Sequence, residues 1–476
     1  NIVYLGAIGS SPGGGDSLQK YDHRTKQVQL VTIWPEDETF GAEEMRYRFQ
    51  WTYPIVFDPH DPDVLYATGN VVFRTTDGGQ SWQAISPDLT HADPETLKPS
   101  GGPLTYDAAG AEIYATIFAF AACPHEKGVL WAGSDDGLVH VTRDGGQTWQ
   151  NVTPPEMAKF TQVTMLEPSP FEVGTVYATA VRHKMGDYAP YIYKTSDYGQ
   201  TWSRLDSDLP ADDFCRVIRA DPTRPGLLYL GTETRLYVSF DDGQHWQSFQ
   251  ANLPITPIYD LVIKENDLVV ATHGRSFWIL DDLTPLHHLR DEVLAAERIL
   301  FPPRDTVRFP KPIFADLFAS EAGKSYHVAL GAPATYQQTK NERGEIERRF
   351  FDAGEDVPRG VQFFYYFKEK PEAEVTLTIA TADGEEIDQF TSVKAEKEAD
   401  QKFPLILAEA GMNRFLWDMT YRDGAKVTSQ PKIYNAPGPL LPPGDYTAVL
   451  TVGDWSQTVA FQLLPDPRVT GVSAED

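Results

Sequence analysis

The stretch "RTTDGGQSW" occupies residues 74–82, and three close copies of it follow along the chain. The copies are "VTRDGGQTW" at 141–149, "KTSDYGQTW" at 194–202 and "VSFDDGQHW" at 238–246. Each contains an octet with the pattern Ser/Thr-x-Asp-x-Gly-x-x-Trp, which begins at residue 75, 142, 195 or 239. Such an ordered series is an internal repeat, and it decides how the rest of the chain is interpreted.

The octet has the chemistry of a tight turn. Its aspartate carboxylate accepts backbone N–H bonds, its glycine adopts a positive φ at no steric cost, and its tryptophan packs the turn onto a core. Strand-like runs such as "VLYATGNVVF" at 64–73 precede it, so each octet is expected to join two antiparallel strands. We assign a structural role to Asp77, Gly79, Trp82, Asp144, Gly146, Trp149, Asp197, Gly199, Trp202, Asp241, Gly243 and Trp246.

The repeat extends beyond the octets. Two degenerate copies bracket the series, "NIVYLGAIG" at the start and "DLVVATHGRSFWILDDLTPL" at 267–286. A period of about 40 to 50 residues fits four-stranded blades. We therefore predict an all-β chain whose residues 1–285 form a β-propeller with about six blades in this chain, a larger propeller being left open.

The pattern changes after residue 285. Residues 286–310 are interpreted as a connector, and residues 311–476 as a separate domain. Apolar residues alternate in "EVTLTIATADGEEIDQF" at 374–390 and in "DYTAVLTVGDWSQTVAFQL" at 445–463, with a turn in the middle of each. These hairpins predict an immunoglobulin-like or fibronectin-like β-sandwich.

The octet resembles the Asp-box, or BNR repeat, of sialidases, sortilin-type receptors and xyloglucanase-type glycoside hydrolases. The whole chain is most similar to bacterial secreted proteins with a sortilin-like (VPS10-type) propeller, often labelled BNR repeat glycosyl hydrolases. Further stretches that carry this resemblance are "ISPDLT" at 85–90, "VVATHGRSFWILDDL" at 269–283 and "GMNRFLWDM" at 411–419. The resemblance implies a propeller and a secreted, periplasmic or cell-surface location, and it leaves the activity open.

Charge excludes some partners. The chain has 41 basic and 68 acidic residues, a formal net charge of -27. A nucleic-acid-binding protein would show a basic footprint, and no apolar run is long enough to span a bilayer. No cofactor is expected; calcium at "SDDG" (134–137) or "FDDG" (240–243) is an alternative, although neither stretch has EF-hand spacing.

The two cysteines, Cys123 and Cys215, belong to non-adjacent repeats. Non-adjacent blades do not bring their Cα atoms within disulfide reach. We therefore expect two free, buried thiols.

Ligand-binding residues of a propeller come from strand ends and loops around its channel. Octet turns between outer strands point away from that channel, so the candidates lie in other segments. Each of these residues also has an ordinary structural explanation as a loop residue or strand-end ion pair. The candidates are His273 and Arg275 in "THGRSF", Arg182, His183 and Asp187 in "VRHKMGDYAPY", Arg46 and Arg48 in "AEEMRYRFQW", and Asp107 and Glu112 in "LTYDAAGAEIY".

Three functions fit this sequence. We favour a binding or scaffolding propeller that holds a protein, peptide or glycan in its channel. A glycoside hydrolase is the alternative, but it needs two carboxylates at a defined separation, and spacing alone identifies no such pair. The third is a structural subunit of an extracellular assembly. Because the first repeat begins without lead-in strands, an N-terminal segment or a second chain is expected to complete the propeller.

Overall fold

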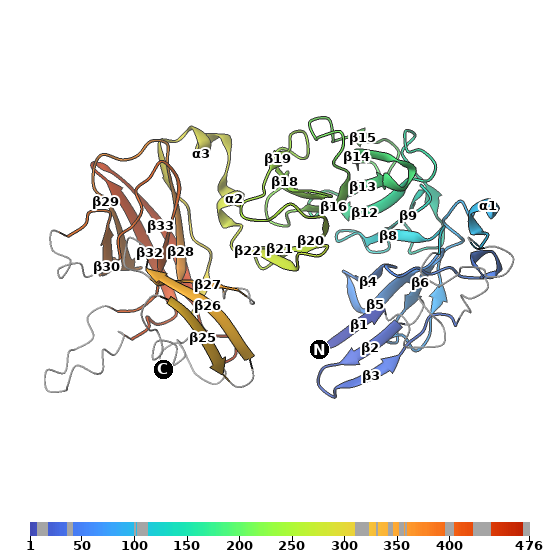
Figure 1. Ribbon diagram of the computed structural model, residues 1–476, viewed down its shortest axis with the longest axis horizontal. Helices are drawn as coiled ribbons and strands as arrows, with labels where there is room; N and C mark the ends of the chain where they lie inside the picture. The colour runs from blue at the N-terminus through green and yellow to red at the C-terminus, as the bar shows by residue number, and fades with distance from the viewer. Residues whose placement is uncertain are drawn as a thin grey trace. The chain divides into compact units, whose positions relative to one another are not determined.

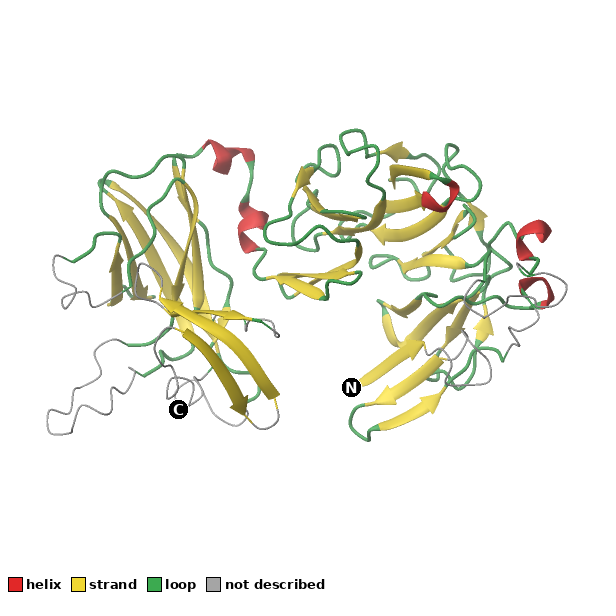
Figure 2. Cartoon of the chain, in the orientation of Figure 1, coloured by secondary structure: helices red, strands yellow, loops and turns green. Residues whose placement is uncertain are grey.

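The structure is a computed structural model that describes residues 1–6, 18–35, 41–99, 101, 113–309, 323–329, 332–340, 346–351, 357, 359–395, 404–421 and 439–469. The chain divides into two units, Asn1–Leu280 and Asp281–Asp476. Strands dominate both units, and helices are few and short (Figure 2). The prediction of an all-β fold is therefore confirmed. The first unit ends at Leu280, whereas the sequence placed this boundary near residue 285.

The described residues of the first unit form six antiparallel sheets that follow one another along the chain (Figure 1). We number them sheets 1 to 6. Their strands are β1 (Ile2–Gly6), β2 (Leu18–Asp22) and β3 (Gln27–Leu30); β4 (Ile55–Asp58), β5 (Asp61–Thr68), β6 (Val72–Thr75) and β7 (Gln83–Ala84); β8 (Ile117–Ala122), β9 (Leu130–Ser134), β10 (Val139–Thr142) and β11 (Gln150–Asn151); β12 (Gln162–Pro168), β13 (Val176–Arg182), β14 (Asp187–Thr195) and β15 (Ser203–Arg204); β16 (Cys215–Ala220), β17 (Leu228–Thr232), β18 (Leu236–Ser239) and β19 (Gln247–Ser248); and β20 (Ile258–Lys264), β21 (Asp267–Thr272) and β22 (Phe277–Leu280).

The helical segments lie outside these sheets. Two helices follow the last strand of the first unit; α3 lies within the predicted connector 286–310, and α2 begins two residues ahead of it. Among the described residues, no helix is long and apolar enough to cross a membrane. The helical segments are η3 (Ala42–Glu44), α1 (Pro94–Leu97), η4 (His183–Met185), α2 (Thr284–His288) and α3 (Asp291–Ala295).

Each octet forms a turn between the third and fourth strands of a sheet. In the second octet the Asp144 carboxylate accepts bonds from the Thr148 backbone N–H at 2.9 Å and from the hydroxyls of Thr142 and Thr148 at 2.8 and 2.7 Å. Gly146 has a φ of 93°, and its N–H donates to the Thr142 hydroxyl at 3.0 Å. The octets around Asp77 and Asp197 make the same set of bonds. The octet around Asp241 differs in one bond, because the Nδ1 atom of His245 takes the place of the second hydroxyl.

The same octets join each sheet to the one before it. The indole N–H of Trp149 donates to the carbonyl oxygen of Ile85 at 2.9 Å, and that of Trp202 donates to Val152 at 2.7 Å. Ile85 and Val152 each follow the fourth strand of the preceding sheet. Trp82 and Trp246 make the equivalent bonds to Val31 and Leu205. We call this contact the tryptophan latch.

The octet glycine is needed for the latch as well as for the turn. A Cβ atom on Gly199 would lie 2.6 Å from the Cβ of Val152, the residue whose carbonyl accepts the Trp202 bond. Likewise, a Cβ on Gly79 would lie 2.8 Å from the Cβ of Val31. A side chain at this position would therefore push the neighbouring sheets apart, independently of the backbone strain.

The apolar cores lie between successive sheets. One buried cluster joins sheets 2 and 3, a second joins sheets 3 and 4, and a third joins sheets 4 and 5. The first strands β4, β8, β12, β16 and β20 contact one another in series. Arg219 on β16 links three of them, because it bonds Glu167 on β12 at 2.9 Å and Asp260 on β20 at 2.8 Å. This serial stacking is the arrangement of propeller blades.

The first and last sheets each have three strands. Val31 follows β3 and accepts the Trp82 latch, so β1, β2 and β3 correspond to the second, third and fourth strands of a complete sheet. β20 contacts the first strand β16, so β20, β21 and β22 correspond to the first, second and third strands. Within the described part of the chain, sheet 1 therefore has no first strand and sheet 6 has no fourth.

The second unit is a β-sandwich with an additional hairpin sheet. One sheet has the order β23-β28-β31, another has the order β24-β33-β32-β29-β30, and the third has the order β25-β26-β27. The first two sheets contribute Phe363, Trp417, Leu377 and Phe461, among others, to one buried cluster. The strands are β23 (Arg298–Leu300), β24 (Thr306–Val307), β25 (Gly323–Ala329), β26 (Ala332–Lys340), β27 (Ile346–Phe350), β28 (Val361–Phe367), β29 (Val375–Thr381), β30 (Glu386–Thr391), β31 (Gly411–Trp417), β32 (Gly444–Val452) and β33 (Trp455–Leu464).

Both cysteines are free and buried, as the sequence predicted. Cys123 follows β8 in sheet 3, and Cys215 begins β16 in sheet 5. Burial raises the pKa of the Cys215 thiol well above its usual value, so this thiol stays protonated and unreactive at neutral pH.

Replacement of Asp144 by alanine tests the structural role of the octet. Asp144→Ala leaves the Thr148 N–H and two hydroxyls without their acceptor, so the melting temperature should fall by about 2 to 4 °C at pH 7. Hydrogen bonds from Thr148 and Thr142 lower the pKa of Asp144 to about 2. A lowered carboxyl pKa stabilises the fold above the unfolded-state pKa, and this stabilisation is lost as pH falls through about 2.

The difference in melting temperature between wild type and Asp144→Ala should accordingly shrink between pH 4 and pH 2. Asp144→Asn, which keeps one acceptor oxygen, serves as the matched control and should melt between the two. Equal melting temperatures for all three proteins at pH 7 would contradict the assigned role.

Candidate functional site

Antiparallel strand order gives each sheet of the first unit two distinct ends. The octets and the turns between first and second strands lie at one end. The turns between second and third strands lie at the other end, together with the crossing segments that lead from one sheet to the next. We call this second end the loop face. A ligand on the loop face is separated from the octets by the length of the strands.

All of the described candidates from the sequence lie in loop-face segments. Arg182, His183 and Asp187 surround the turn between β13 and β14, and His273 and Arg275 lie in the turn between β21 and β22. Arg46 and Arg48 lie in the crossing from β3 to β4. Asp107 and Glu112 are outside the described residues.

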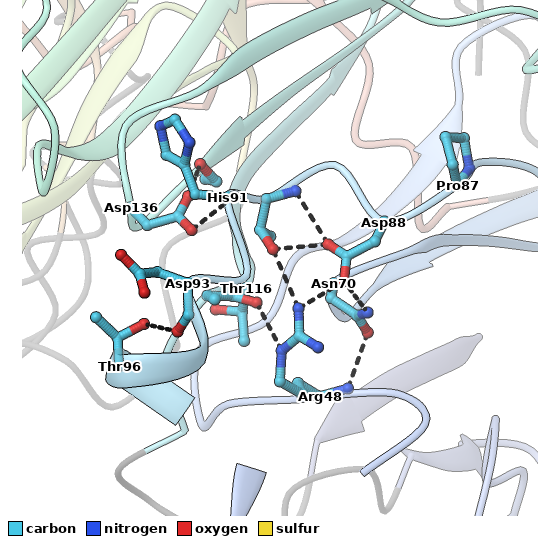
Figure 3. Close-up of polar contacts among 12 residues, drawn as sticks. Arg48, Asn70, Pro87, Asp88, His91, Asp93, Thr96, Thr116 and Asp136 are labelled. Atoms are coloured by element: carbon cyan, nitrogen blue, oxygen red, sulfur yellow. Dashed lines mark hydrogen bonds and ion pairs between the residues drawn. The ribbon is translucent and has the colours of Figure 1, made fainter. Parts of the chain in front are cut away.

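Arg48 is buried in a polar network between crossing segments (Figure 3). Its guanidinium bonds the Asp88 carboxylate at 2.7 Å and the carbonyl oxygen of Ala115 at 3.1 Å. The Asn70 side chain bonds both Asp88 and the Arg48 backbone N–H. Burial raises the pKa of Asp88, but bonds from Thr90 and Asn70 and the Arg48 charge outweigh it and leave this pKa below the usual range.

This network fixes four loop segments together: the β3–β4 crossing, the β5–β6 turn, the "ISPDLT" stretch and the approach to β8. Arg48 thus has protein partners that engage its guanidinium. Arg46, two residues earlier, lies over the rings of Trp34 and Tyr47 at 5.0 and 5.1 Å from their centroids. That contact is a cation–π interaction within the same crossing.

A cavity of about 190 Å³ opens on the loop face between sheets 3 and 4. It contains one carboxyl group, that of Asp135, and a basic rim of Arg182, His183 and Lys184. The Nδ1 atom of His183 is buried and has no hydrogen-bond partner among the described residues. The full lining is Tyr114, Asp135, Phe160, Gln162, Val181, Arg182, His183, Lys184 and Met185.

Asp135 is held at this cavity by Thr116, the residue before β8. The Thr116 N–H and hydroxyl each bond the Asp135 carboxyl group at 2.9 Å. Burial raises the pKa of Asp135 to about 7, and the neighbouring charge of Asp136 adds to this rise. A substantial fraction of the Asp135 carboxyl groups is therefore protonated near neutral pH and can donate a proton.

Aromatic and basic side chains continue from this cavity across sheets 4, 5 and 6. His183 stacks on Phe214 with ring centroids 4.8 Å apart and ring planes 10° apart. The Arg216 guanidinium lies 5.0 Å from the Phe214 centroid and 4.2 Å from that of Tyr259. Tyr259 contacts His273 with centroids 4.8 Å apart. We call these five residues the aromatic strip.

The strip brings together two candidates that lie far apart in the sequence, His183 and His273. Burial lowers the pKa of His183, and Arg216 and Lys184 lower it further, so its ring is neutral at pH 7. Tyr259 is 47% exposed although it lies in the first strand of sheet 6. Tyr188, which is also exposed, packs 6.2 Å from Phe214. The strip is thus a partly open, aromatic surface next to a cavity that contains a protonatable carboxyl group.

Sequence reasoning missed Asp135, Phe214, Arg216 and Tyr259 as members of one site. The sequence indicates Asp135 only as part of "SDDG", the stretch considered for calcium. A signal for two of the others was present, because Arg216 and Tyr259 are each the second residue of a first strand that is otherwise largely apolar. In a blade stack such positions face the neighbouring first strands and the channel.

The described residues of "SDDG" and "FDDG" do not form a set of calcium ligands. Among the described residues there is no group of three histidine, cysteine, aspartate or glutamate side chains placed to hold a metal ion. In "SDDG", Asp135 accepts bonds from Thr116, and Asp136 accepts bonds from Ser134 and the His91 N–H. In "FDDG", Asp242 accepts bonds from Tyr177 and Lys194. Protein donors engage these oxygens, so the stretches do not fit a calcium site.

Comparison with curated proteins finds two fungal relatives. The chain is 26% identical over 261 residues to a probable oligoxyloglucan-reducing end-specific xyloglucanase of Neosartorya fischeri, a match that covers 50% of this chain and 30% of the relative. It is 23% identical over 269 residues to the corresponding xyloglucanase of Emericella nidulans, covering 49% of this chain and 32% of the relative. The match therefore spans about a third of each relative. No protein-family model matches the chain.

Solved structures give weaker likenesses. The GH74 xyloglucanase from Xanthomonas campestris aligns with 99% of this chain and 87% of its own, at 12% identity and a TM-score of 0.42. The GH74 enzyme from Niastella koreensis aligns with 76% of this chain and 58% of its own, at 13% identity and a TM-score of 0.28. At these scores neither likeness carries an argument about this chain.

The protonation of Asp135 can be tested through stability. A raised carboxyl pKa means that the folded protein keeps a proton that the unfolded chain loses. The resulting stabilisation is complete below the unfolded-state pKa near 3.8 and is lost as pH rises through about 7. Asp135→Asn has no proton to lose, so its melting temperature relative to wild type should rise between pH 4 and pH 8. A difference that is the same at both pH values would contradict a buried, protonatable Asp135.

Proposed function

We propose that the first unit is a carbohydrate-active propeller of the glycoside hydrolase type. In this proposal an extended polysaccharide lies along the aromatic strip and is cleaved where the strip meets Asp135. The observation that carries the proposal is the continuity between the two: His183 belongs both to the strip and to the lining of the cavity with Asp135.

The composition of the aromatic strip favours a chain of sugar residues as the ligand. Sugar rings present apolar C–H faces that pack on aromatic rings, and their hydroxyls accept bonds from charged donors. Tyr259 supplies such an exposed ring, Arg216 lies between it and Phe214, and the Phe214 ring is itself buried. The strip runs over three successive sheets, which suits a polymer better than a single small molecule.

Asp135 supplies the chemistry. A carboxyl group with a pKa near 7 acts as a general acid at neutral pH, and cleavage begins when such an acid protonates the glycosidic oxygen. The carboxylate left on Asp135 is then stabilised by the two bonds from Thr116 and by the Lys184 charge. The names of the two curated relatives suggest xyloglucan or a related β-glucan as the substrate class.

The second candidate is binding without hydrolysis, in which the same surface holds a glycan, a peptide or a protein. One observation favours it. Hydrolysis requires a second carboxylate about 5 to 9.5 Å from the acid, and Asp135 provides the single carboxyl group among the described residues that line the cavity. A sortilin-like ligand-binding role belongs to this candidate, and so does a structural role in a larger assembly.

A polymeric glycan as the ligand would place the protein outside the cytoplasm. A polymeric glycan is too large to enter a cell, so a protein that acts on it is secreted, periplasmic or displayed at the cell surface. This location remains part of the proposal and can be checked by fractionation of the producing cells.

Binding and cleavage of xyloglucan oligosaccharides distinguish the candidates. Tyr259→Ala removes one packing surface and should weaken binding by about tenfold. Phe171→Ala is the matched control, because Phe171 is also an exposed aromatic residue but lies in the turn between β12 and β13, at the octet end. It should leave binding unchanged. Titration calorimetry of the three proteins gives the comparison.

The release of new reducing ends then tests catalysis. Asp135→Asn should bind within about threefold of wild type but lose at least about 100-fold in rate, the contribution typical of a general acid. Wild-type binding that depends on Tyr259 without any cleavage would select the second candidate. Binding that is equal in wild type and Tyr259→Ala would reject the strip as the site.

A further inference from the structure

The second unit has a cavity of its own, with a volume of about 810 Å³. It lies where the turn between β28 and β29 meets the turn between β32 and β33 and the residues that lead into β23. Cavities that hold small ligands have volumes of about 300 to 1,000 Å³. We call this one the sandwich cavity.

Strand pairing brings these segments to one end of the sandwich. The antiparallel register pairs Val375 at the start of β29 with Val452 at the end of β32. It also pairs Arg298 at the start of β23 with Phe367 at the end of β28. Both sheets of the sandwich therefore contribute strand ends to the cavity.

Contacts between these segments fix the shape of the cavity. The backbone N–H of Lys368 donates to the carbonyl oxygen of Glu297 at 2.8 Å. The Arg298 guanidinium donates to the carbonyl oxygen of Val452 at 3.4 Å, which joins the two sheets. A Cβ atom on Gly453 would lie only 3.8 Å from the Cβ of Ala373, so the two turns approach each other closely. The site is thus built on strand ends and short turns, which hold side chains more precisely than long loops do.

Trp455 gives the cavity an apolar surface. It pairs with Val452 across a two-residue turn, whose first residue, Gly453, has a φ of 58° that glycine adopts without strain. The Trp455 ring packs against the buried core of the sandwich and also lines the cavity. It is the one aromatic side chain among the described residues of the lining. The core thus holds the ring in place before a ligand arrives.

Charged side chains of both signs make up most of the remaining lining. The basic ones are Arg298, Lys368 and Lys370. The acidic ones are Glu297, Glu369, Glu372 and Asp454. Ammonium and guanidinium groups donate hydrogen bonds, whereas carboxylates accept them. A polyanion would meet more carboxylates than cations here, and a cation would meet three positive charges, so the lining favours a neutral ligand with many donors and acceptors.

We propose that the sandwich cavity binds a neutral oligosaccharide. The apolar face of a sugar ring packs on Trp455, and sugar hydroxyls, which both donate and accept hydrogen bonds, engage side chains of both signs. A peptide is a poorer occupant, because peptide recognition relies on several side-chain pockets, and this lining combines one aromatic ring with a largely charged surface.

This proposal does not rest on cleavage at Asp135 or on the aromatic strip. If the first unit also binds a glycan, the sandwich cavity gives the same chain a second attachment point. Binding at one of the two sites would then raise the effective concentration of the polymer at the other.

Titration calorimetry of the full chain tests the proposal with oligosaccharides of xyloglucan, cellulose, mannan and xylan. The measurements use the Tyr259→Ala protein, so that any contribution of the aromatic strip is reduced. Trp455→Ala and Lys368→Ala are each added to it; the Lys368 side chain is exposed, so its removal leaves the core packing intact. Tyr421→Ala is the matched control, because Tyr421 is an exposed aromatic residue of the second unit outside the cavity lining. A heparin oligosaccharide and tetra-alanine serve as the anionic and peptide probes.

At least one neutral oligosaccharide should bind. Trp455→Ala should weaken this binding by at least about tenfold and Lys368→Ala by about threefold, whereas Tyr421→Ala should leave it unchanged. Melting temperatures check that each variant is folded. The proposal is overturned if none of the four sugars binds, if neither variant weakens binding, or if only heparin or the peptide binds. The comparison of wild type with Tyr259→Ala tests the proposed function separately, so that failure of one proposal is distinguishable from failure of the other.

Discussion

The tryptophan latch is the contact on which the first unit depends. An indole N–H from each octet bonds the carbonyl that follows the last strand of the previous sheet, and the octet glycine leaves room for that residue. One turn therefore closes its own hairpin and also fixes the distance between its sheet and the preceding sheet. Because the contact recurs at four junctions, the sheets stack with their first strands in series, and the loops of successive sheets meet at the opposite end.

The difference between the octet end and the loop face explains where a carboxyl group can take part in a reaction. At the octet end the carboxylate oxygens of the aspartates accept hydrogen bonds from groups of their own turns. These bonds lower the pKa values of the aspartates and keep them ionised. At the loop face, burial acts on Asp135 in the opposite direction and keeps a proton on it near neutral pH. The aromatic strip reaches this carboxyl group through His183. Asp144 and Asp135, which both precede a glycine closely in the sequence, thus take different roles because their surroundings differ.

Features that depend on residues close together in the sequence could be predicted from the sequence. The octet turns, the six repeats, the all-β class and the free cysteines follow from short-range patterns and their spacing. The aromatic strip could not be predicted in the same way, since His183, Phe214, Arg216 and Tyr259 meet only through the stacking of three sheets. The sequence predicted that Arg48 lies on a loop. It could not predict the bonds of Arg48 to Asp88 and Ala115, because these partners lie 40 and 67 residues away in the sequence. A tryptophan at the end of a turn likewise indicates packing without revealing which carbonyl it bonds.

In the proposed function a glycan lies along the aromatic strip with its scissile bond at Asp135. A crystal structure of the protein with a bound xyloglucan oligosaccharide tests it most directly. We predict a sugar ring over Tyr259 and a glycosidic oxygen within hydrogen-bond reach of the Asp135 carboxyl group. An oligosaccharide bound at the octet end or on the second unit, with the strip empty, would contradict it.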